Sequence, residues 1–383
     1  MSPDTTYDVM VIGAGVFGAW TAYTLTRNGA RVLLVDAYGP GNSRSSSSGE
    51  TRIIRMGYGA DEIYTRWSHR ALQLWQQFDH ETGARIFHRT GVLWLGREGA
   101  QNVTATLATL ANVGVPHKTL ARAEIEKRFP QIACSEGEFA IYEPESGALM
   151  ARRSVQRVVE EFQRLGGTYQ IAEVETPAGD GTLTALASFS GESFRAHKYV
   201  FACGAWLAKL FPELLGRRIF PSRQEIYFFG VPSGDRNYSA GNFPTWLDTN
   251  SEMYGIPDIE GRGFKVASDV HGAAVDPDTI ERVAGETLPL VRDYIRHRFP
   301  ALRNAPVIES RVCQYENSSN GDFLIDRHPN FENVWLVGGG SGHGFKHGPA
   351  LGEYVSRLIL EAGQTDPRFA LASKQTIKNR TIH

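Results

Sequence analysis

Hydrophobic positions in the first part of the sequence follow the pattern of a strand, a glycine turn, a helix and a second strand. Residues 7–12 are typical of a buried strand, residues 13–18 of a tight turn, and residues 19–28 of an amphipathic helix that ends at Gly29. Residues 31–36 are nearly all apolar, as expected for a parallel strand covered on both faces. The pattern therefore predicts a βαβ unit.

Beyond this unit the pattern predicts two kinds of structure. We predict helices over residues 63–78, 155–165, 288–299 and 348–360, and strands over residues 90–95, 139–141, 199–202 and 334–337. Residues 223–275 have the pattern of strands separated by turns, which favours an antiparallel sheet. Residues 39–49 are rich in Gly and Ser and contain almost no core-forming side chains, so they are a candidate functional loop.

The α/β segments lie at both ends and in the middle of the sequence, with strand-rich segments between them. A chain of 383 residues also exceeds what one hydrophobic core usually fills. We therefore expect an α/β protein with two domains. A Rossmann-like nucleotide-binding domain is expected from residues 1–85, 145–220 and 321–383, and an antiparallel-sheet substrate domain from residues 86–144 and 221–320.

Composition excludes several classes of protein. With 42% hydrophobic residues, 21% charged residues and a net charge of −2, the chain has no basic surface for nucleic acid or membrane. Its three cysteines include no Cys-x-x-Cys pair and are too few for a disulfide framework. Residues 9–20 lack a signal-peptide pattern and are too short to span a bilayer, and residues 381–383 are no peroxisomal or retention signal. We expect a cytoplasmic protein.

Gly13, Gly15 and Gly18 form a G-x-G-x-x-G motif between the predicted strand and helix. The first glycine permits the turn, the second lets the backbone approach a pyrophosphate, and the third allows close helix packing. Asp36 ends the second strand, where an acceptor for a ribose hydroxyl is expected. The motif predicts a dinucleotide site but does not separate NAD from FAD.

A second glycine motif, residues 338–346, follows a strand and precedes a helix near the end of the sequence. A helix N-terminus there can face the electron-rich pyrimidine end of a flavin and stabilise its reduced anion. A nicotinamide enzyme has no need of a second site of this kind. FAD is therefore favoured over NAD.

The Ser-Gly-His-Gly-Phe-Lys sequence of residues 341–346 and the Gly-Glu-Thr-Arg-Ile-Ile-Arg sequence of residues 49–55 resemble motifs of the monomeric sarcosine oxidase family. This family comprises FAD-dependent amine and N-methyl amino acid oxidases of the D-amino acid oxidase superfamily, among them N-methyltryptophan, pipecolate and fructosyl-amino-acid oxidases. The resemblance covers nearly the whole chain and extends through residues 203–206, Tyr254, Lys265, residues 276–279 and residues 323–329.

The resemblance implies a monomer with FAD that oxidises a small amine, an N-substituted (secondary amine) amino acid, at its C–N bond and reduces O₂ to H₂O₂. It implies cofactor contacts for Gly13, Gly15, Gly18, Asp36, Ser47, Arg52, Val174, Cys313, Gly340, Gly342, His343, Gly344 and Lys346. Composition alone makes Cys313 a buried small hydrophobe, whereas the resemblance implies a thioether to the 8α-methyl carbon of the flavin. Such a bond would hold the flavin and raise its potential.

The resemblance also assigns roles to four cations. Arg52 would lie against the flavin, while Arg55 and Lys346 would clamp the substrate carboxylate. Lys265 would lie over the flavin, where a fixed cation lowers the barrier to superoxide formation. Taken alone, the two arginines could share a face of a helical turn or be solvated, and both lysines could be surface residues; a lysine at a helix start also needs a compensating partner.

Further expectations concern the pocket. Tyr254 and Tyr315 match pocket tyrosines of the family that would hydrogen-bond the substrate. His343 and His347 could be metal ligands, but no carboxylate or cysteine is spaced to complete a site, so no metal is predicted. Asp269 stands where sarcosine-oxidising members have histidine, and Ser48 and residues 316–321 also depart from the family pattern. A carboxylate in the pocket favours a substrate with a cationic or polyhydroxyl portion.

We therefore expect an oxidase of an N-substituted amino acid that transfers a hydride to the flavin. The alternative on the same fold is a dehydrogenase that passes electrons to a quinone or a protein. A flavin-binding module without catalysis would not need Arg55, Lys346 and Lys265 together.

Overall fold

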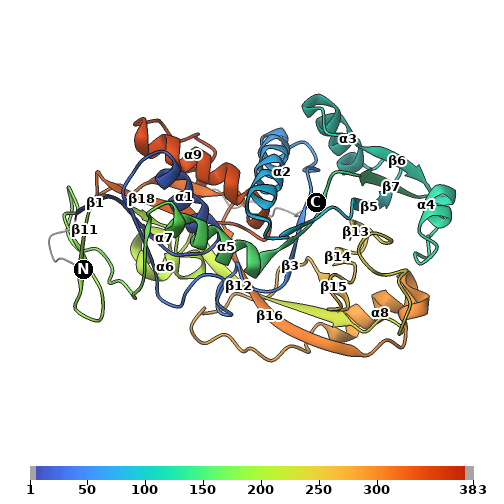
Figure 1. The fold of residues 1–383 in the computed structure, drawn as a ribbon. Coiled ribbons are helices and arrows are strands. Elements are labelled where there is room, and N and C mark those ends of the chain that lie inside the picture. Colours follow the sequence, from blue (N-terminus) through green and yellow to red (C-terminus); the bar gives the residue numbers. More distant parts are fainter. Residues whose placement is uncertain (1–5, 376–383) are drawn as a thin grey trace.

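The computed structural model describes residues 6–375, and residues 381–383, where no peroxisomal or retention signal was expected, lie outside this range. The described residues form two large sheets and one small sheet, with helices packed on them (Figure 1). No helix within residues 6–375 combines the length and the hydropathy of a membrane-spanning segment. The predicted α/β class is confirmed.

The first large sheet has the strand order β17-β18-β11-β1-β2-β9, and β10 pairs with β11. Its strands are β1 (Thr6–Ile12), β2 (Val32–Asp36), β9 (Thr168–Ile171), β10 (Leu186–Ala187), β11 (Ser193–Phe201), β17 (Leu324–Arg327) and β18 (Val334–Gly338). The central strands run parallel and are buried on both faces, which explains their continuous apolar runs. Helices α1 (Val16–Arg27), α5 (Ala151–Arg164) and α9 (Gly348–Leu360) pack together beside this sheet.

The second large sheet has the order β16-β12-β15-β14-β13-β5-β7-β6. Its strands are β5 (Val92–Arg97), β6 (Lys118–Ala121), β7 (Glu138–Glu143), β12 (Ile219–Phe229), β13 (Thr245–Asp248), β14 (Met253–Ile256), β15 (Phe264–Ser268) and β16 (Val307–Ser318). Neighbouring strands are antiparallel except β13 and β5, which pair in parallel. The small sheet has the order β3-β8-β4, from β3 (Thr51–Ile54), β8 (Gly147–Met150) and β4 (Phe87–His88).

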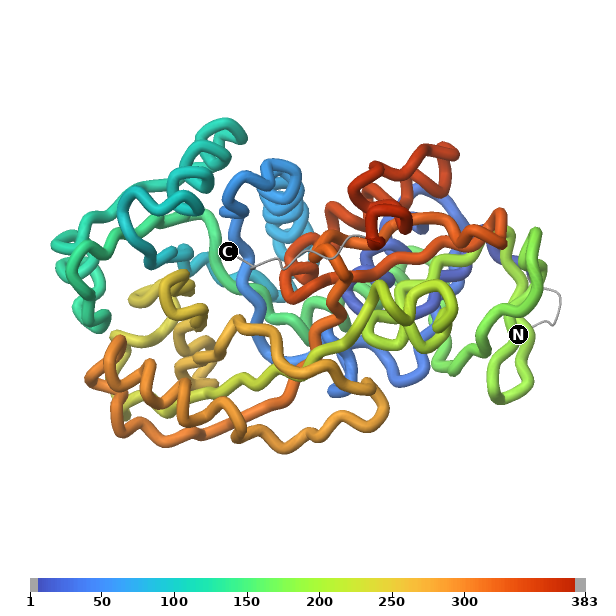
Figure 2. Tube along the Cα trace, turned by 180° about the vertical axis from the view of Figure 1, so that it is seen from behind, coloured from blue at the N-terminus to red at the C-terminus, as the bar shows by residue number. Residues whose placement is uncertain are grey.

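The remaining helices cover the sheets and join them. They are α2 (Glu62–Thr82), α3 (Gln101–Val113), α4 (Arg122–Arg128), α6 (Leu207–Leu210), α7 (Pro212–Leu215) and α8 (Leu288–Arg298), with 3₁₀ turns η1 (Gly204–Trp206), η2 (Pro300–Leu302), η3 (Phe345–His347) and η4 (Leu371–Gln375). Strands β12 and β16 pair with each other and are long. They extend from the half of the molecule that contains the first large sheet into the half that contains the second, as both views show (Figures 1 and 2).

An aromatic cluster joins the first helix to the part of the chain that carries the second glycine motif. Trp20 on α1 packs edge-on against Trp75 and Phe78 on α2, with ring centroids 5.0 and 5.1 Å apart. The indole N–H of Trp75 donates to the carbonyl oxygen of Lys346 at 2.8 Å. The hydrophobic core therefore fixes the backbone of a predicted site residue.

Several predicted boundaries were wrong. Helix α1 begins at Val16, inside the glycine motif, rather than at residue 19. Helix α3 escaped prediction because threonines take two of its buried positions, Thr106 and Thr109, and interrupt the apolar stripe. Helix α4 buries a single apolar side chain, Ile125, and so lacks a stripe. The expected domain boundaries stay a prediction.

Candidate active site

In the described part of the chain, two neighbouring cavities contain almost all the predicted site residues. The larger has a volume of about 380 Å³ and is lined by the β1–α1 turn, the end of β2, the loop at residues 42–47, the end of β11 and the second glycine motif. The smaller has a volume of about 70 Å³. Both are lined by Arg52, Tyr315, Gly342 and Phe345, so the cavities meet at these residues.

The first glycine motif forms a turn that has no room for a side chain at Gly13 or Gly18. Gly13 has φ +103°, and a Cβ there would lie 2.3 Å from the carbonyl oxygen of Ala202. A Cβ on Gly18 would lie 1.8 Å from the carbonyl oxygen of Gly13. Gly13 and Gly15 line the larger cavity, whereas Gly18 lies within α1 against the turn. The backbone can therefore approach a ligand at the start of α1 closely.

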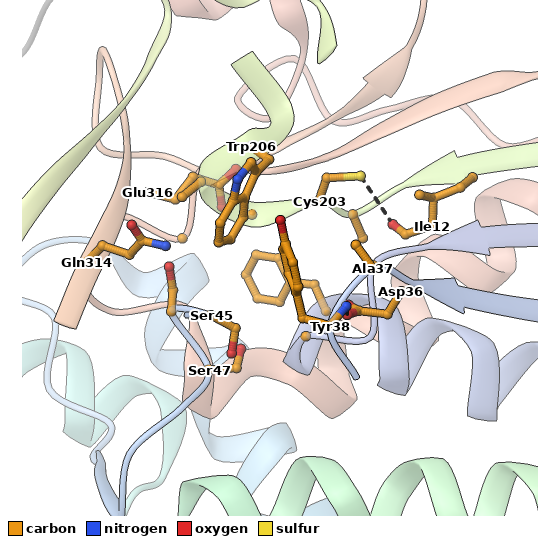
Figure 3. A pocket seen from close by; sticks show the side chains of 18 of the residues that line it. Ile12, Asp36, Ala37, Tyr38, Ser45, Ser47, Cys203, Trp206, Gln314 and Glu316 are labelled. Carbon is orange, nitrogen blue, oxygen red and sulfur yellow. Dashed lines mark hydrogen bonds between the residues drawn. The ribbon is translucent and has the colours of Figure 1, made fainter. Parts of the chain in front are cut away.

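Asp36 and Ser47 line the larger cavity beside this turn (Figure 3). The carboxylate of Asp36 accepts the backbone N–H of Ala14 at 2.7 Å and those of Tyr38 and Gly39 at 2.8 Å each. Burial raises the pKa of Asp36, while these N–H groups lower it. A carboxylate has about four acceptor sites, so one remains for a ligand hydroxyl. The hydroxyl of Ser47 accepts the N–H of Val16 at 3.0 Å and ties the serine-rich loop to the helix.

The second glycine motif forms another part of the wall of the larger cavity. Gly340, Gly342 and Gly344 line the larger cavity, and a Cβ on Gly344 would lie 2.8 Å from the Cα of Gly340. Ser341 has φ +44°, donates its backbone N–H to the carbonyl oxygen of Glu316 at 2.7 Å, and accepts the N–H of Ser318 at 3.0 Å. Residues 316–318 therefore hold the glycine turn in place.

Pattern analysis missed several residues of the larger cavity. The rings of Tyr38 and Trp206 lie beside each other with centroids 5.9 Å apart (Figure 3). The indole N–H of Trp206 donates to Asp278 at 2.8 Å. Glu316 lines the same cavity, and burial raises the pKa of its carboxyl to about 7 against the effect of the Gly339 and Gly340 N–H groups. The available signal was that Trp206 belongs to the motif at residues 203–206, Glu316 to the departing segment at residues 316–321, and Tyr38 follows Asp36 by two residues. Val174, a predicted cofactor contact, also lines this cavity.

One face of the second large sheet forms a wall of the smaller cavity. Side chains alternate along a strand, so Lys265 on β15 and Asp269, the residue after this strand, point the same way as Cys313 and Tyr315 on β16. Tyr254 on β14 is paired with Ala267 between Lys265 and Asp269. The register of three strands thus brings together five residues that are far apart in sequence.

Lys265 is 2% exposed, and its ammonium donates to the carbonyl oxygen of Thr51 at 3.0 Å. The ammonium also lies 5.5 Å from the centroid of the Tyr254 ring. Burial, followed by the charge of Arg52, lowers the pKa of Lys265 to about 7. The alternative of a surface lysine is therefore wrong.

The two arginines reach the smaller cavity from β3 and the residue after it, not from a helical turn. Arg52 donates to the carbonyl oxygens of Thr51, Ser46 and Ser48 at 2.9, 2.9 and 2.7 Å and so fixes the serine-rich loop. Arg55 is 2% exposed, which excludes a solvated position. Its guanidinium carbon lies 4.4 Å from the centroid of the Trp94 ring. Trp94 was not predicted from the sequence as a site residue.

Lys346 lies at the start of the helical segment and is 4% exposed. Its ammonium donates to the hydroxyl of Tyr58 at 2.7 Å and to the carbonyl oxygen of His343 at 2.9 Å. These acceptors supply the compensation that a cation at the positive end of a helix needs. The alternative of a solvated lysine is wrong here too.

Asp269 is the carboxylate of the smaller cavity. Burial raises its pKa to about 6, while Arg55 and Lys346 lower it. The hydroxyl of Tyr315 interacts with Asp269 and with Tyr254, and burial raises the pKa of both tyrosines. At neutral pH the cavity therefore combines one carboxylate, neutral tyrosines and a set of cations.

A family model described as "DAO: FAD dependent oxidoreductase" matches residues 8–358. Monomeric sarcosine oxidase from Bacillus sp. (strain B-0618) is 33% identical, over 99% of this chain and 100% of its own. Peroxisomal sarcosine oxidase from Homo sapiens is 31% identical, over 93% and 92%. The chain belongs to the sarcosine oxidase family of FAD-dependent oxidoreductases. The crystal structure of L-proline dehydrogenase from P. horikoshii has the same fold, with a TM-score of 0.84, 21% identity and coverage of 97% and 99%.

The larger cavity fits the FAD of this family. The crowded glycines leave a cradle for the pyrophosphate at the start of α1, where the N-cap residue Gly15 has no side chain, and Asp36 retains an acceptor for ribose. Glu316 has a buried oxygen, Oε1, without a hydrogen-bond partner among the described residues. Cys313 is 8% exposed and packs against Ile226, Phe228 and Ala267. This position is compatible both with a buried small hydrophobic residue and with a thioether to the flavin.

Proposed function

We propose that the protein is a cytoplasmic, monomeric oxidase of an N-substituted amino acid, with H₂O₂ as product. The observation that carries this proposal is the smaller cavity, where Arg52, Arg55, Lys265 and Lys346 surround a space of about 70 Å³ that meets the larger cavity. The names of two relatives, both sarcosine oxidases, support a secondary amine as substrate because sarcosine is N-methylglycine.

Arg55 and Lys346 would hold the substrate carboxylate between a guanidinium and an ammonium. This would place the amine toward Tyr254 and Tyr315, whose hydroxyl groups are neutral and so can donate or accept hydrogen bonds. Asp269 would face the part of the substrate beyond the nitrogen and favour a cationic or hydroxyl-bearing group there. Bound FAD would take a hydride from the carbon next to nitrogen and deliver the electrons to O₂.

The residues for FAD are proposed from the geometry of the two cavities. Gly13, Gly15, Asp36, Ser47, Val174, Gly340, Gly342 and Gly344 would hold the dinucleotide, with Gly18 closing the turn behind it, and Arg52, His343 and Lys346 would lie near the flavin. Lys265 would stabilise the negative charge that forms when O₂ takes the first electron. The expected domains, 1–85, 145–220 and 321–383 for FAD and 86–144 and 221–320 for substrate, are part of this proposal.

The clamp is tested by replacing Arg55 with alanine and assaying peroxide release. Loss of a desolvated charge-assisted pair should cost about 2–4 kcal/mol and raise KM for the amino acid correspondingly. Amines that lack the carboxylate should be poor substrates of the wild type. The wild type and the Arg55→Ala variant should release peroxide from these amines at similar rates. Equal activity on amino acids and their decarboxylated analogues would overturn the clamp.

Covalent attachment through Cys313 has a separate test. Acid precipitation should leave the yellow colour in the pellet of the wild type and release it to the supernatant in a Cys313→Ser variant. A wild type whose colour washes out has bound FAD without a thioether, and the proposed substrate chemistry then stands without the tether.

A further inference from the structure

Tyr58 contacts both cations of the proposed carboxylate clamp. The guanidinium carbon of Arg55 lies 4.7 Å from the centroid of the Tyr58 ring, and the ammonium of Lys346 lies 5.0 Å from it. The ammonium also donates to the Tyr58 hydroxyl at 2.7 Å. A single buried aromatic side chain therefore interacts with two cations that come from segments nearly three hundred positions apart in numbering.

The backbone around Tyr58 is fixed by a buried carboxylate. Glu143 is completely buried and accepts the N–H groups of Met56 at 2.8 Å and Gly57 at 3.0 Å. The same carboxylate accepts the indole N–H of Trp94 at 2.8 Å, and the Trp94 ring lies 4.4 Å from the Arg55 guanidinium. Glu143 thus holds the Trp94 ring directly and fixes the backbone that leads into Tyr58.

The hydroxyl of Tyr58 is also connected to two histidines. It lies 2.8 Å from His347 Nε2 and 3.2 Å from His343 Nδ1, and His343 Nε2 lies 3.1 Å from the carbonyl oxygen of Gly321. A carbonyl oxygen only accepts, so His343 carries hydrogen on Nε2, and in its neutral form its Nδ1 accepts from Tyr58. The hydroxyl then has lone pairs to accept from Lys346 and from His347. With both histidines neutral, each of these hydrogen bonds has one donor and one acceptor.

We propose that Tyr58 is a positioning residue that sets the geometry of both clamp cations. This inference rests on the proposed function, because it takes Arg55 and Lys346 to be the carboxylate-binding pair. The hydroxyl fixes the direction of the Lys346 ammonium, and the ring fixes the plane of the Arg55 guanidinium. The two contributions are separable, because phenylalanine keeps the ring and removes only the hydroxyl.

The experiment measures carboxylate affinity on the FAD-loaded protein. Acetate is titrated while the flavin absorbance is followed, and acetamide serves as the uncharged probe. Tyr58→Phe should raise the Kd of acetate about tenfold, the size expected for losing a hydrogen bond to a charged group, and leave acetamide unchanged. Tyr58→Leu should raise it further. The rate of anaerobic flavin reduction at saturating substrate should stay within about threefold in Tyr58→Phe.

A double variant separates positioning from general stability. Because the hydroxyl acts through Lys346, adding Tyr58→Phe to Lys346→Met should cause no further loss of acetate affinity. Tyr199→Phe is the matched control: this buried hydroxyl accepts the N–H of Ala196 at 3.0 Å in the first sheet and should not affect acetate binding.

The outcomes distinguish the two proposals. If Arg55→Ala and Lys346→Met leave the acetate Kd unchanged, the clamp itself is wrong. If they weaken binding while Tyr58→Phe does not, or if the Tyr58 effect persists in the Lys346→Met background, the clamp stands and the positioning role of Tyr58 is overturned. Should Tyr58→Leu fail to fold, the phenylalanine variant and the double variant still decide.

Discussion

At the scale of single residues, the smaller cavity concentrates positive charge at low solvent exposure. Arg55 and Lys265 are each 2% exposed and Lys346 is 4% exposed. Burying a charge is costly unless nearby groups stabilise it. The carbonyl oxygen of Thr51 accepts from Lys265, and the hydroxyl of Tyr58 and the carbonyl oxygen of His343 accept from Lys346. The lining of the cavity includes four cationic side chains, Arg52 among them, and the carboxylate of Asp269, so its excess of positive charge favours an anion.

Replacing Lys265 with methionine removes this cation and keeps the length of the side chain. If the ammonium stabilises the charge formed on O₂, its loss should slow flavin reoxidation about a hundredfold, or about 3 kcal/mol. Flavin reduction by the substrate should stay near normal. Anaerobic and aerobic stopped-flow experiments measure the two half-reactions separately. A wild type that reoxidises as slowly as free flavin but reduces a quinone quickly would favour the dehydrogenase.

The same lysine gives a pH dependence. Its pKa is lowered to about 7, so the ammonium is present below that pH and is lost as the pH rises through it. The O₂ reoxidation rate should therefore fall on the alkaline side, with a midpoint at or above pH 7, because negative charge on the reduced flavin favours the protonated lysine. Stopped-flow reoxidation measured across pH 6–9 tests this. The Lys265→Met variant should be slow and flat over the same range, and a matching slope in that variant would assign the dependence to another group.

The individual site residues could be predicted only in part. Hydrophobic pattern made Lys265 and Lys346 surface lysines, and only the family motifs indicated a shared site. Tyr58 and Trp94 were not predicted because nothing in their local sequence distinguishes an aromatic that contacts a cation from one in the core. Their role follows from contacts with Arg55 and Lys346, which the sequence pattern does not contain.

At the scale of elements, β16 lies between the two cavities, and its successive side chains point alternately toward one and the other. Cys313 faces the smaller cavity, Gln314 and Glu316 face the larger, and Tyr315 lies where the two meet. The pattern analysis did not assign this strand, because polar residues occupy buried positions along it: Gln314, Glu316 and Asn317 are all buried. A strand between two cavities has no apolar face to detect, so local periodicity could not find it.

The start of α1 offers an element-level prediction. Gly18→Ala should destabilise the protein, since its Cβ would lie 1.8 Å from the carbonyl oxygen of Gly13 and the turn would have to move. Gly15→Ala should leave the thermal midpoint of the FAD-free protein close to that of the FAD-free wild type, since its Cβ would lie 3.4 Å from the Ser47 hydroxyl. It should nevertheless reduce FAD content by crowding the pyrophosphate. Thermal unfolding and the flavin-to-protein absorbance ratio measure the two effects. Equal loss of stability in both variants would contradict this division.

At the scale of the whole molecule, the site exists only where distant segments meet. Arg55 follows β3 of the small sheet, Lys346 belongs to the second glycine motif, and Asp269 follows β15 of the second large sheet. The α/β class and the βαβ unit were predictable because they depend on local periodicity. The parallel pairing of β13 with β5 depends on segments about 150 positions apart and leaves no local signal.

This arrangement assigns the two ends of the substrate to different parts of the molecule. The carboxylate would meet Arg55 and Lys346, and the nitrogen substituent would meet Asp269. Asp269→Asn removes the charge and keeps the shape. For substrates with a cationic or polyhydroxyl N-substituent, kcat/KM should fall about ten- to a hundredfold, the range for losing a charge-assisted hydrogen bond, while N-methyl amino acids should change little. Peroxide release from a panel of N-methyl, cyclic secondary and glycated amino acids measures this.

The pH dependence provides the control for this prediction. Burial raises the pKa of Asp269 to about 6, so its carboxylate is charged above that pH and becomes neutral as the pH falls through it. In the wild type, kcat/KM for the preferred N-substituent should therefore decrease from pH 7 to pH 5 relative to that for an N-methyl amino acid. In Asp269→Asn this ratio should not vary with pH, because the titrating group is gone. A uniform fall for every substrate would mean that Asp269 acts on the clamp through Arg55 and Lys346 rather than on the nitrogen substituent.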